Sequence, residues 1–235
     1  MAGINAALTA LGREKITLPR SGSYIGTLID DLVTKGTNEP YRMMTSRSEF
    51  RLLLRQDNAD QRLTPTGHAC GLIQNERFEA FLAKKEAIEA EKARLEATHL
   101  GPDAVNPLLD GMGLERIKSG VSLGDLLRRP QITYDDLTPI DARRPALSPE
   151  IIKTVETDVK YAGYIKRELA EVERQKKLED KFIPDDMDYG KIKGLRLEAG
   201  QKLAKFRPTT VGQASRISGV SPADISVLLL YLGIK

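Results

Sequence analysis

Apolar side chains recur at intervals of three and four residues along most of this chain, which is the spacing of one face of an α-helix. Two stretches keep this spacing long enough to predict long helices, residues 75–97 and residues 148–181. A Ser-Pro-Glu sequence at residues 148–150 supports the start of the second of these helices, because serine caps helices and proline fits the first helical position. Two long amphipathic helices pair most simply as an antiparallel hairpin.

Shorter helices are predicted around these two, at residues 2–11, 23–33, 46–55, 114–119, 123–128, 134–137, 210–217 and 222–232. The helix at 46–55 rests on Ser46 and Glu49, which have the spacing of a capping box in which each side chain satisfies a free backbone N–H. Aromatic residues make up only 5% of the chain, which disfavours a fold of many strands. The predicted fold class is therefore all-α, a long helical hairpin with short helices and a small C-terminal helical bundle.

Composition narrows the possible chemistry. The 36 basic and 33 acidic residues leave a net charge of +3, so a nucleic-acid-binding surface would have to be a local patch. A single cysteine, Cys70, rules out an internal disulfide, and His68 and His99 are the only histidines available for a metal site. No apolar stretch reaches about 18 residues and no signal peptide is present, so we expect a cytoplasmic protein with no membrane contact.

The chain has no glycine-rich dinucleotide or phosphate-binding motif, so we expect it to have no catalytic activity and to bind no cofactor or metal by itself. The alternative is that this chain is itself an enzyme and binds flavin.

Arginines are the most informative local feature. Arg47, Arg51 and Arg55 recur every four residues, and on a helix they would fall within about 80° of arc. Like charges at this spacing repel by a few tenths of a kcal/mol per pair, and a polyanion would offset that repulsion. Guanidinium groups also bind phosphates through two hydrogen bonds. The alternative is pairing inside the fold with the nearby carboxylates Glu49, Asp57 and Asp60.

A second basic cluster lies in the later long helix. Lys160, Lys166 and Arg167 alternate with Tyr161 and Tyr164, whose rings could stack on bases. The alternative is a solvated helix face on which the tyrosines pack. We include the three cations among the candidate RNA-binding residues.

The end of the chain has the outline of a helix-turn-helix, which suggests DNA binding. Its second helix argues against that function, because it has no Arg, Lys, Asn or Gln to read base edges. The apolar stripe of that helix predicts either core packing or a surface that docks a partner protein. The stripe consists of Ile225, Leu228, Leu229 and Leu232.

Several segments resemble one family, the glucose-inhibited division protein A (GidA) family, also called MnmG. Residues 24–62 carry YIGTLIDDLVTKG and EPYRMMTSRSEFRLLLRQDNADQR. Three later segments agree in order and spacing, namely LLRRPQITY at 126–134, KYAGYIKR at 160–167 and VGQASRISGVSPADISVLL at 211–229. The start, AGINAA, is similar to the helix that closes the family's flavin-binding domain.

This resemblance implies an enzyme that modifies the wobble uridine of tRNA. The complete enzyme binds FAD in a Rossmann-like domain, uses NADH, forms a homodimer and works with the GTPase MnmE. Its C-terminal region is helical and serves tRNA binding and partner docking. The FAD fingerprint and the catalytic cysteines of the family have no counterpart in this sequence.

The resemblance also assigns residues. Arg42, in EPYR, and Arg51, in EFR, match family arginines implicated in tRNA recognition, whereas Arg47 and Arg55 join them by helical geometry alone. Three consecutive segments are expected. Residues 1–64 hold the tail of the flavin-domain helix and Arg-rich connecting helices, and residues 65–185 form a helical domain with both long helices. Residues 186–235 form a C-terminal helical subdomain. Alternative functions are a helical module that only docks proteins and a helix-turn-helix DNA-binding protein.

Overall fold

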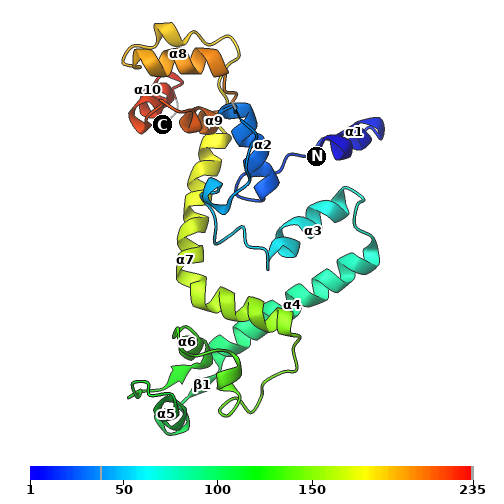
Figure 1. The fold of residues 1–235 in the computed structure, drawn as a ribbon, viewed down its shortest axis with the longest axis vertical. Coiled ribbons are helices and arrows are strands. Elements are labelled where there is room, and N and C mark those ends of the chain that lie inside the picture. The colour runs from blue at the N-terminus through cyan, green and yellow to red at the C-terminus, as the bar shows by residue number, and fades with distance from the viewer. Residues whose placement is uncertain (38, 234–235) are drawn as a thin grey trace. The chain divides into compact units, whose positions relative to one another are not determined.

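The computed structural model describes residues 1–37 and 39–233, and 58% of the chain is helical, which confirms the all-α fold class (Figure 1). The long helices α4, Asn75–Ala97, and α7, Pro149–Glu179, begin and end close to the predicted positions. So do the shorter helices α1 (Ala2–Ala10), α2 (Tyr24–Thr34), α9 (Val211–Arg216) and α10 (Pro222–Tyr231). Periodicity and caps therefore locate most of the helices.

Two compact units make up the chain, and their segments alternate along the sequence. The first unit combines residues 1–16 with 52–166, and the second combines 17–51 with 167–235. The division falls within α7, so this helix contributes residues to both units. It differs from the three consecutive segments predicted, because segments distant in sequence pack together within each unit.

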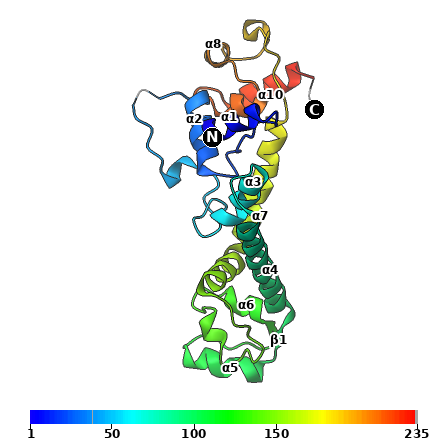
Figure 2. The ribbon, with the colours of Figure 1, turned by 90° about the vertical axis from the view of Figure 1, so that its right-hand side faces the viewer.

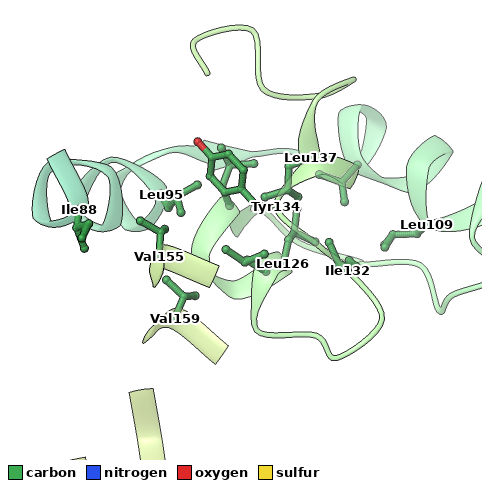
Figure 3. Packing of buried hydrophobic residues seen from close by; sticks show 12 residues of the cluster. Ile88, Leu95, Leu109, Leu126, Ile132, Tyr134, Leu137, Val155 and Val159 are labelled. Carbon is green, nitrogen blue, oxygen red and sulfur yellow. The ribbon is translucent and has the colours of Figure 1, made fainter. Parts of the chain in front are cut away.

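The core of the first unit lies between the two long helices and the short elements that connect them. Ile88 and Leu95 of α4 pack with Val155 and Val159 of α7, around the buried ring of Tyr134 (Figure 3). The remaining buried members of this cluster are Val105, Leu109, Leu123, Leu126, Leu127, Ile132 and Leu137. Burial, and then the hydrogen bond of its hydroxyl to Glu91, raise the pKa of Tyr134 to about 12.

The two long helices pack together, but their relative direction is not the antiparallel one predicted. Lys84 of α4 pairs with Glu150 of α7, and two turns later Lys92 lies 3.6 Å from Asp158. Both pairs have the same offset in sequence, so the helices run in the same direction where they meet. The antiparallel expectation was wrong because the connection between the helices is long enough to return the chain to Lys84, inside α4, before α7 begins.

That connection forms its own small elements, which gather at the C-terminal end of α4 (Figure 2). They include α5 (Pro102–Gly111), α6 (Leu123–Leu127), the 3₁₀ turn η2 (Asp135–Leu137) and the strands β1 (His99–Leu100) and β2 (Val121–Ser122). The strands pair antiparallel. The predictions for α6 and η2 are confirmed, whereas residues 114–119 are not helical and α5 was not predicted.

The second unit holds the C-terminal bundle and α2. Its helical elements besides α2, α9 and α10 are the short turns η1 (Thr45–Arg47) and η3 (Tyr189–Lys191), the end of α7, and α8 (Leu197–Phe206). Side chains from η3, α8, α9 and α10 form its core, among them Tyr189, Leu203, Val211 and Leu228. Thr210 caps α9 and Ser221 caps α10, and each hydroxyl accepts a hydrogen bond from the backbone N–H three residues later.

Within the described part of the chain, no helix is long and apolar enough to cross a membrane.

Candidate nucleic-acid interface

Three candidate arginines lie in one segment of the second unit. Arg42, Arg47 and Arg51 belong to residues 39–51, which follow α2, and all three side chains are exposed. Within residues 1–37 and 39–233, no carboxylate forms an ion pair with any of them. The three guanidinium groups are therefore open to an external anion. We call residues 39–51 the arginine segment.

The predicted helix at 46–55 is wrong. Only the three-residue turn η1, Thr45–Arg47, is helical there, and an irregular chain follows it. The Ser48 hydroxyl accepts the backbone N–H of Phe50 over 3.1 Å, which is a local turn that competes with a helix. Glu49 is drawn into an ion pair with Arg20 instead of capping. Arg47, Arg51 and Arg55 consequently share no helix face.

Arg20 is the residue that organises this region. Its side chain is buried, and its Nη1 donates to Asp30 over 2.9 Å and to Asp31 over 2.7 Å. Its Nη2 donates to both carboxylate oxygens of Glu49, over 2.9 and 3.0 Å. Because Glu49 lies between Arg47 and Arg51 in sequence, this pairing removes the carboxylate best placed to neutralise them. Sequence reasoning missed Arg20, since nothing in the local pattern marks it.

A tyrosine ties the beginning of the arginine segment to α2. The Tyr41 hydroxyl donates to Asp31 Oδ2 over 2.7 Å, and the guanidinium carbon of Arg47 lies 5.2 Å from the centroid of the Tyr41 ring. Burial, followed by the hydrogen bond to Asp31, raises the pKa of Tyr41 to about 12. The segment that bears the exposed arginines is thus held at Tyr41 and at Glu49.

Asp31 remains charged in this buried position. Burial by itself would raise the pKa of its carboxyl group. Hydrogen bonds from Lys35, Tyr41 and Arg20 outweigh that effect and lower the pKa to about 2.

Arg55 is held inside the first unit. Its side chain is only 13% exposed, and its Nη2 lies 2.7 Å from Asp158 Oδ1. Its Nε lies 3.1 Å from Asp57 Oδ2, so two carboxylates bind the guanidinium. The structure thus shows the internal pairing that was the alternative for this residue, and Arg55 does not share the exposure of the other three.

The side chains of the second basic cluster differ in their exposure. Lys160 is half-buried and pairs with Glu156 over 2.8 Å, one helical turn away. Lys166 and Arg167 are exposed. The rings of Tyr161 and Tyr164 are also exposed, with their centroids 6.3 Å apart. Of this cluster, the surface side chains are the ones that could reach a nucleic acid.

The predicted docking stripe on α10 lies partly in the core. Ile225 and Leu228 are buried, and Leu229 and Leu232 pack against the same cluster. The exposed apolar side chains of α10 are Leu230 and Tyr231, which are 81% and 54% exposed. Sequence periodicity missed these two because the helix is apolar on most sides.

The described residues provide neither a metal site nor a dinucleotide fold. No group of three or more His, Cys, Asp or Glu side chains in residues 1–37 and 39–233 could hold a metal ion. A Rossmann site needs a parallel strand followed by a glycine-rich turn and a helix, and the described strands are the antiparallel pair β1 and β2. These residues do not fit FAD or NADH, so no chemical step is derived through either cofactor.

Comparison with known proteins relates two consecutive segments of the chain to one family. Residues 75–169 match the family model described as "tRNA modifying enzyme MnmG/GidA C-terminal helical domain". Residues 171–235 match the one described as "tRNA modifying enzyme MnmG/GidA C-terminal helical bundle". Residues 1–74 lie outside both matches.

Individual relatives extend the similarity to nearly the whole chain. The tRNA uridine 5-carboxymethylaminomethyl modification enzyme MnmG of Geobacillus thermodenitrificans is 57% identical over 99% of this chain, and that of Listeria monocytogenes is 54% identical over the same share. The chain spans 37% of the length of each. The structure of Aquifex aeolicus GidA in the form II crystal matches with a TM-score of 0.80 and 44% identity, covering 99% of this chain and 36% of that one.

Proposed function

The chain belongs to the MnmG/GidA family of tRNA-modifying enzymes, as a C-terminal helical region of that family, and we propose that its role is to bind tRNA through the arginine segment. Phosphate contacts from Arg42, Arg47 and Arg51 would position the RNA, because such contacts fix orientation without reading sequence. Lys166 and Arg167, whose side chains are exposed, are further candidates for contact with RNA.

One observation carries this proposal. The three arginines are exposed and have no carboxylate partner among the residues that the structure describes, although acidic residues lie close to them in sequence. Glu49 and Asp31 are bound to Arg20. An exposed, unpaired guanidinium group can neutralise a phosphate of the RNA. The counterions that were bound at that phosphate are then released, and their release favours binding. The network around Arg20 also holds the segment, so that less conformational entropy is lost when RNA binds.

A salt titration with a matched control tests the proposal. Arg51→Ala is compared with Arg143→Ala, an exposed arginine of the first unit whose loss changes the net charge equally. Fluorescence anisotropy with labelled tRNA is followed from low to high salt. We expect Arg51→Ala to weaken binding by about tenfold or more, since hydrogen bonds to charged groups contribute roughly 1.5–3 kcal/mol.

The slope of log K against log salt should also fall by about one unit in Arg51→Ala, as expected for one lost phosphate contact. Arg143→Ala should change neither the affinity nor the slope. If both variants behave alike, the arginine segment has no special role in RNA binding.

Family membership supports further proposals for the complete enzyme. We infer that it acts in the cytoplasm on the wobble uridine of tRNA, uses FAD and NADH bound outside this chain, forms a homodimer and works with the GTPase MnmE. For this chain, the exposed tip of α10 supports docking of that GTPase, because Leu230 and Tyr231 are large apolar side chains in contact with solvent.

Leu230→Asp tests docking in the complete enzyme, with Leu197→Asp on α8 as the control, since Leu197 is 79% exposed. We expect the first variant to lose the GTPase in a pull-down and to keep tRNA, and the second to keep both. Retention of the GTPase by Leu230→Asp would remove α10 from the interface.

A further inference from the structure

Helix α2 has its apolar face on the outside. Four residues on one face of the helix are exposed by 40% to 64%, namely Ile25, Ile29, Leu32 and Val33. The residues buried on its other face are small or polar, namely Gly26, Thr27, Asp31 and Thr34. A helix on the surface of a soluble protein normally has the opposite arrangement, with its apolar stripe toward the core.

This orientation is fixed by contacts within the second unit. A Cβ atom on Gly26 would lie 2.4 Å from the carbonyl oxygens of Leu18 and Pro19, so the helix packs directly on that backbone. Arg20 binds Asp30 and Asp31 beneath the helix, and Arg216 of α9 binds Asp30 over 2.8 Å. Rotating α2 to bury its apolar face would break these buried ion pairs and leave their charges uncompensated.

The apolar face continues into a cavity of about 580 Å³ in the same unit. Ile29 and Val33 line it, together with the apolar side chains of Leu18, Phe50 and Val172. Arg20 also lines this cavity, and its buried Nε has no hydrogen-bond partner among the described residues. The surface therefore offers an apolar groove, which suits an apolar protein segment.

The extent of the family matches bears on which occupant this surface would have. The relatives align with 99% of the chain, but the two C-terminal family models match only residues 75–169 and 171–235. Residues 1–74, including α2, therefore belong to a part of the family protein outside the C-terminal helical domains. This chain spans 37% of the length of the relatives. The remainder of the relatives does not align with this chain, and we refer to it as the remaining region.

We propose that the apolar face of α2 and the adjoining cavity form the interface with the remaining region of an MnmG/GidA chain, in the same polypeptide. This proposal rests on family membership and not on tRNA binding. In the complete protein, Leu32 and its neighbours are covered by apolar residues of that region.

Thiol labelling tests the proposal in a continuous chain. Leu32→Cys is made in a Cys70→Ala background, in the 235-residue chain and in a joined chain, and mass spectrometry of the peptide that contains residue 32 follows its labelling apart from that of other thiols. The joined chain has this sequence in place of the aligned 37% of the Geobacillus thermodenitrificans relative. Maleimide should label Leu32→Cys at least about tenfold more slowly in the joined chain, because local opening must precede reaction at a covered site.

Leu82→Cys is the control, since Leu82 is 46% exposed on α4, and its rate should be the same in both chains. Equal rates for Leu32→Cys in both chains would overturn the proposal. So would slow labelling in the 235-residue chain alone that depends on its concentration, which would identify a second copy as the occupant. Protection that appears in the joined chain only after an external protein is added would also overturn it.

Thermal unfolding provides a second, independent measurement. Leu32→Asp should leave the Tm of the 235-residue chain unchanged, because its side chain is exposed there, and should lower the Tm of the joined chain. Leu82→Asp should lower neither. An unchanged Tm of the joined chain with Leu32→Asp would show that no interface covers this face.

Discussion

Asp31 is the carboxylate on which the geometry of the arginine segment depends, and its charge can be removed with little change in shape by Asp31→Asn. The side chain is 3% exposed and contacts Arg20, Lys35 and Tyr41. The Oδ1 of asparagine can still accept from Arg20 and Lys35, and its Nδ2 can donate to the hydroxyl oxygen of Tyr41, so the substitution removes mainly the charge. We expect the variant to fold and to be less stable.

The magnitude follows from the pKa of Asp31, which is lowered from 3.8 to about 2. A difference of one pKa unit corresponds to about 1.4 kcal/mol, so the charged carboxylate stabilises the second unit by about 2–3 kcal/mol at pH 7. Because the pKa in the folded state is lowered, this contribution is complete above the unfolded pKa of about 4. It should fall to about half near pH 3 and vanish below pH 2.

Urea unfolding of the wild type and of Asp31→Asn at pH 7 and pH 3 measures this effect, with far-UV circular dichroism as the signal. Amide hydrogen exchange of α2 shows whether the loss lies in the second unit. Other carboxylates titrate in both proteins, so their effects cancel in the difference. Asp110→Asn is a control that removes an exposed charge paired with Arg116, which solvent screens.

The difference between the wild type and Asp31→Asn should therefore shrink between pH 7 and pH 3. A difference that stays constant would refute the reasoning, because it would show that the charge of Asp31 is not what its partners stabilise.

Three further substitutions test the packing. Leu126→Ala should lower the free energy of unfolding of the first unit by roughly 2–5 kcal/mol in urea titrations, since Leu126 is fully buried. Gly26→Ala should lower Tm because its Cβ would meet backbone oxygens at 2.4 Å, whereas Gly163→Ala in α7 meets no atom within 4 Å and should not lower Tm. Ser221→Ala removes one half of the capping box with Asp224 and should cost about 0.5–2 kcal/mol by chemical denaturation.

Local signals were sufficient for most of the helices. The starts of α7 and α10 follow from serine followed by proline, because both residues act on the first turn of a helix. The length of α4 follows from an uninterrupted run of helix formers. The direction in which α4 and α7 pack was not accessible in this way, because it depends on the path of the long connection between them.

Local signals failed at the arginine segment. Ser46 and Glu49 have the spacing of a capping box, but Glu49 binds Arg20, which is 29 residues away. The buried guanidinium of Arg20 needs carboxylates to offset the cost of removing its charge from water. Pairing with Glu49 therefore stabilises the fold more than capping a short exposed helix would. The pattern of Arg47, Arg51 and Arg55 drew attention to the segment because it predicted a shared helix face, and that face does not form.

The amino-acid sequence by itself determined the helical class, most helix boundaries and the family, because these depend on periodicity, caps and motifs that can be read over short windows. Only the tertiary structure decided which charges are neutralised and which face of α2 is inward. Asp30 binds Arg216, 186 residues along the chain, and Arg55 binds Asp158, 103 residues along. Such partners are chosen by packing, and a buried charge requires its partner wherever the chain supplies one.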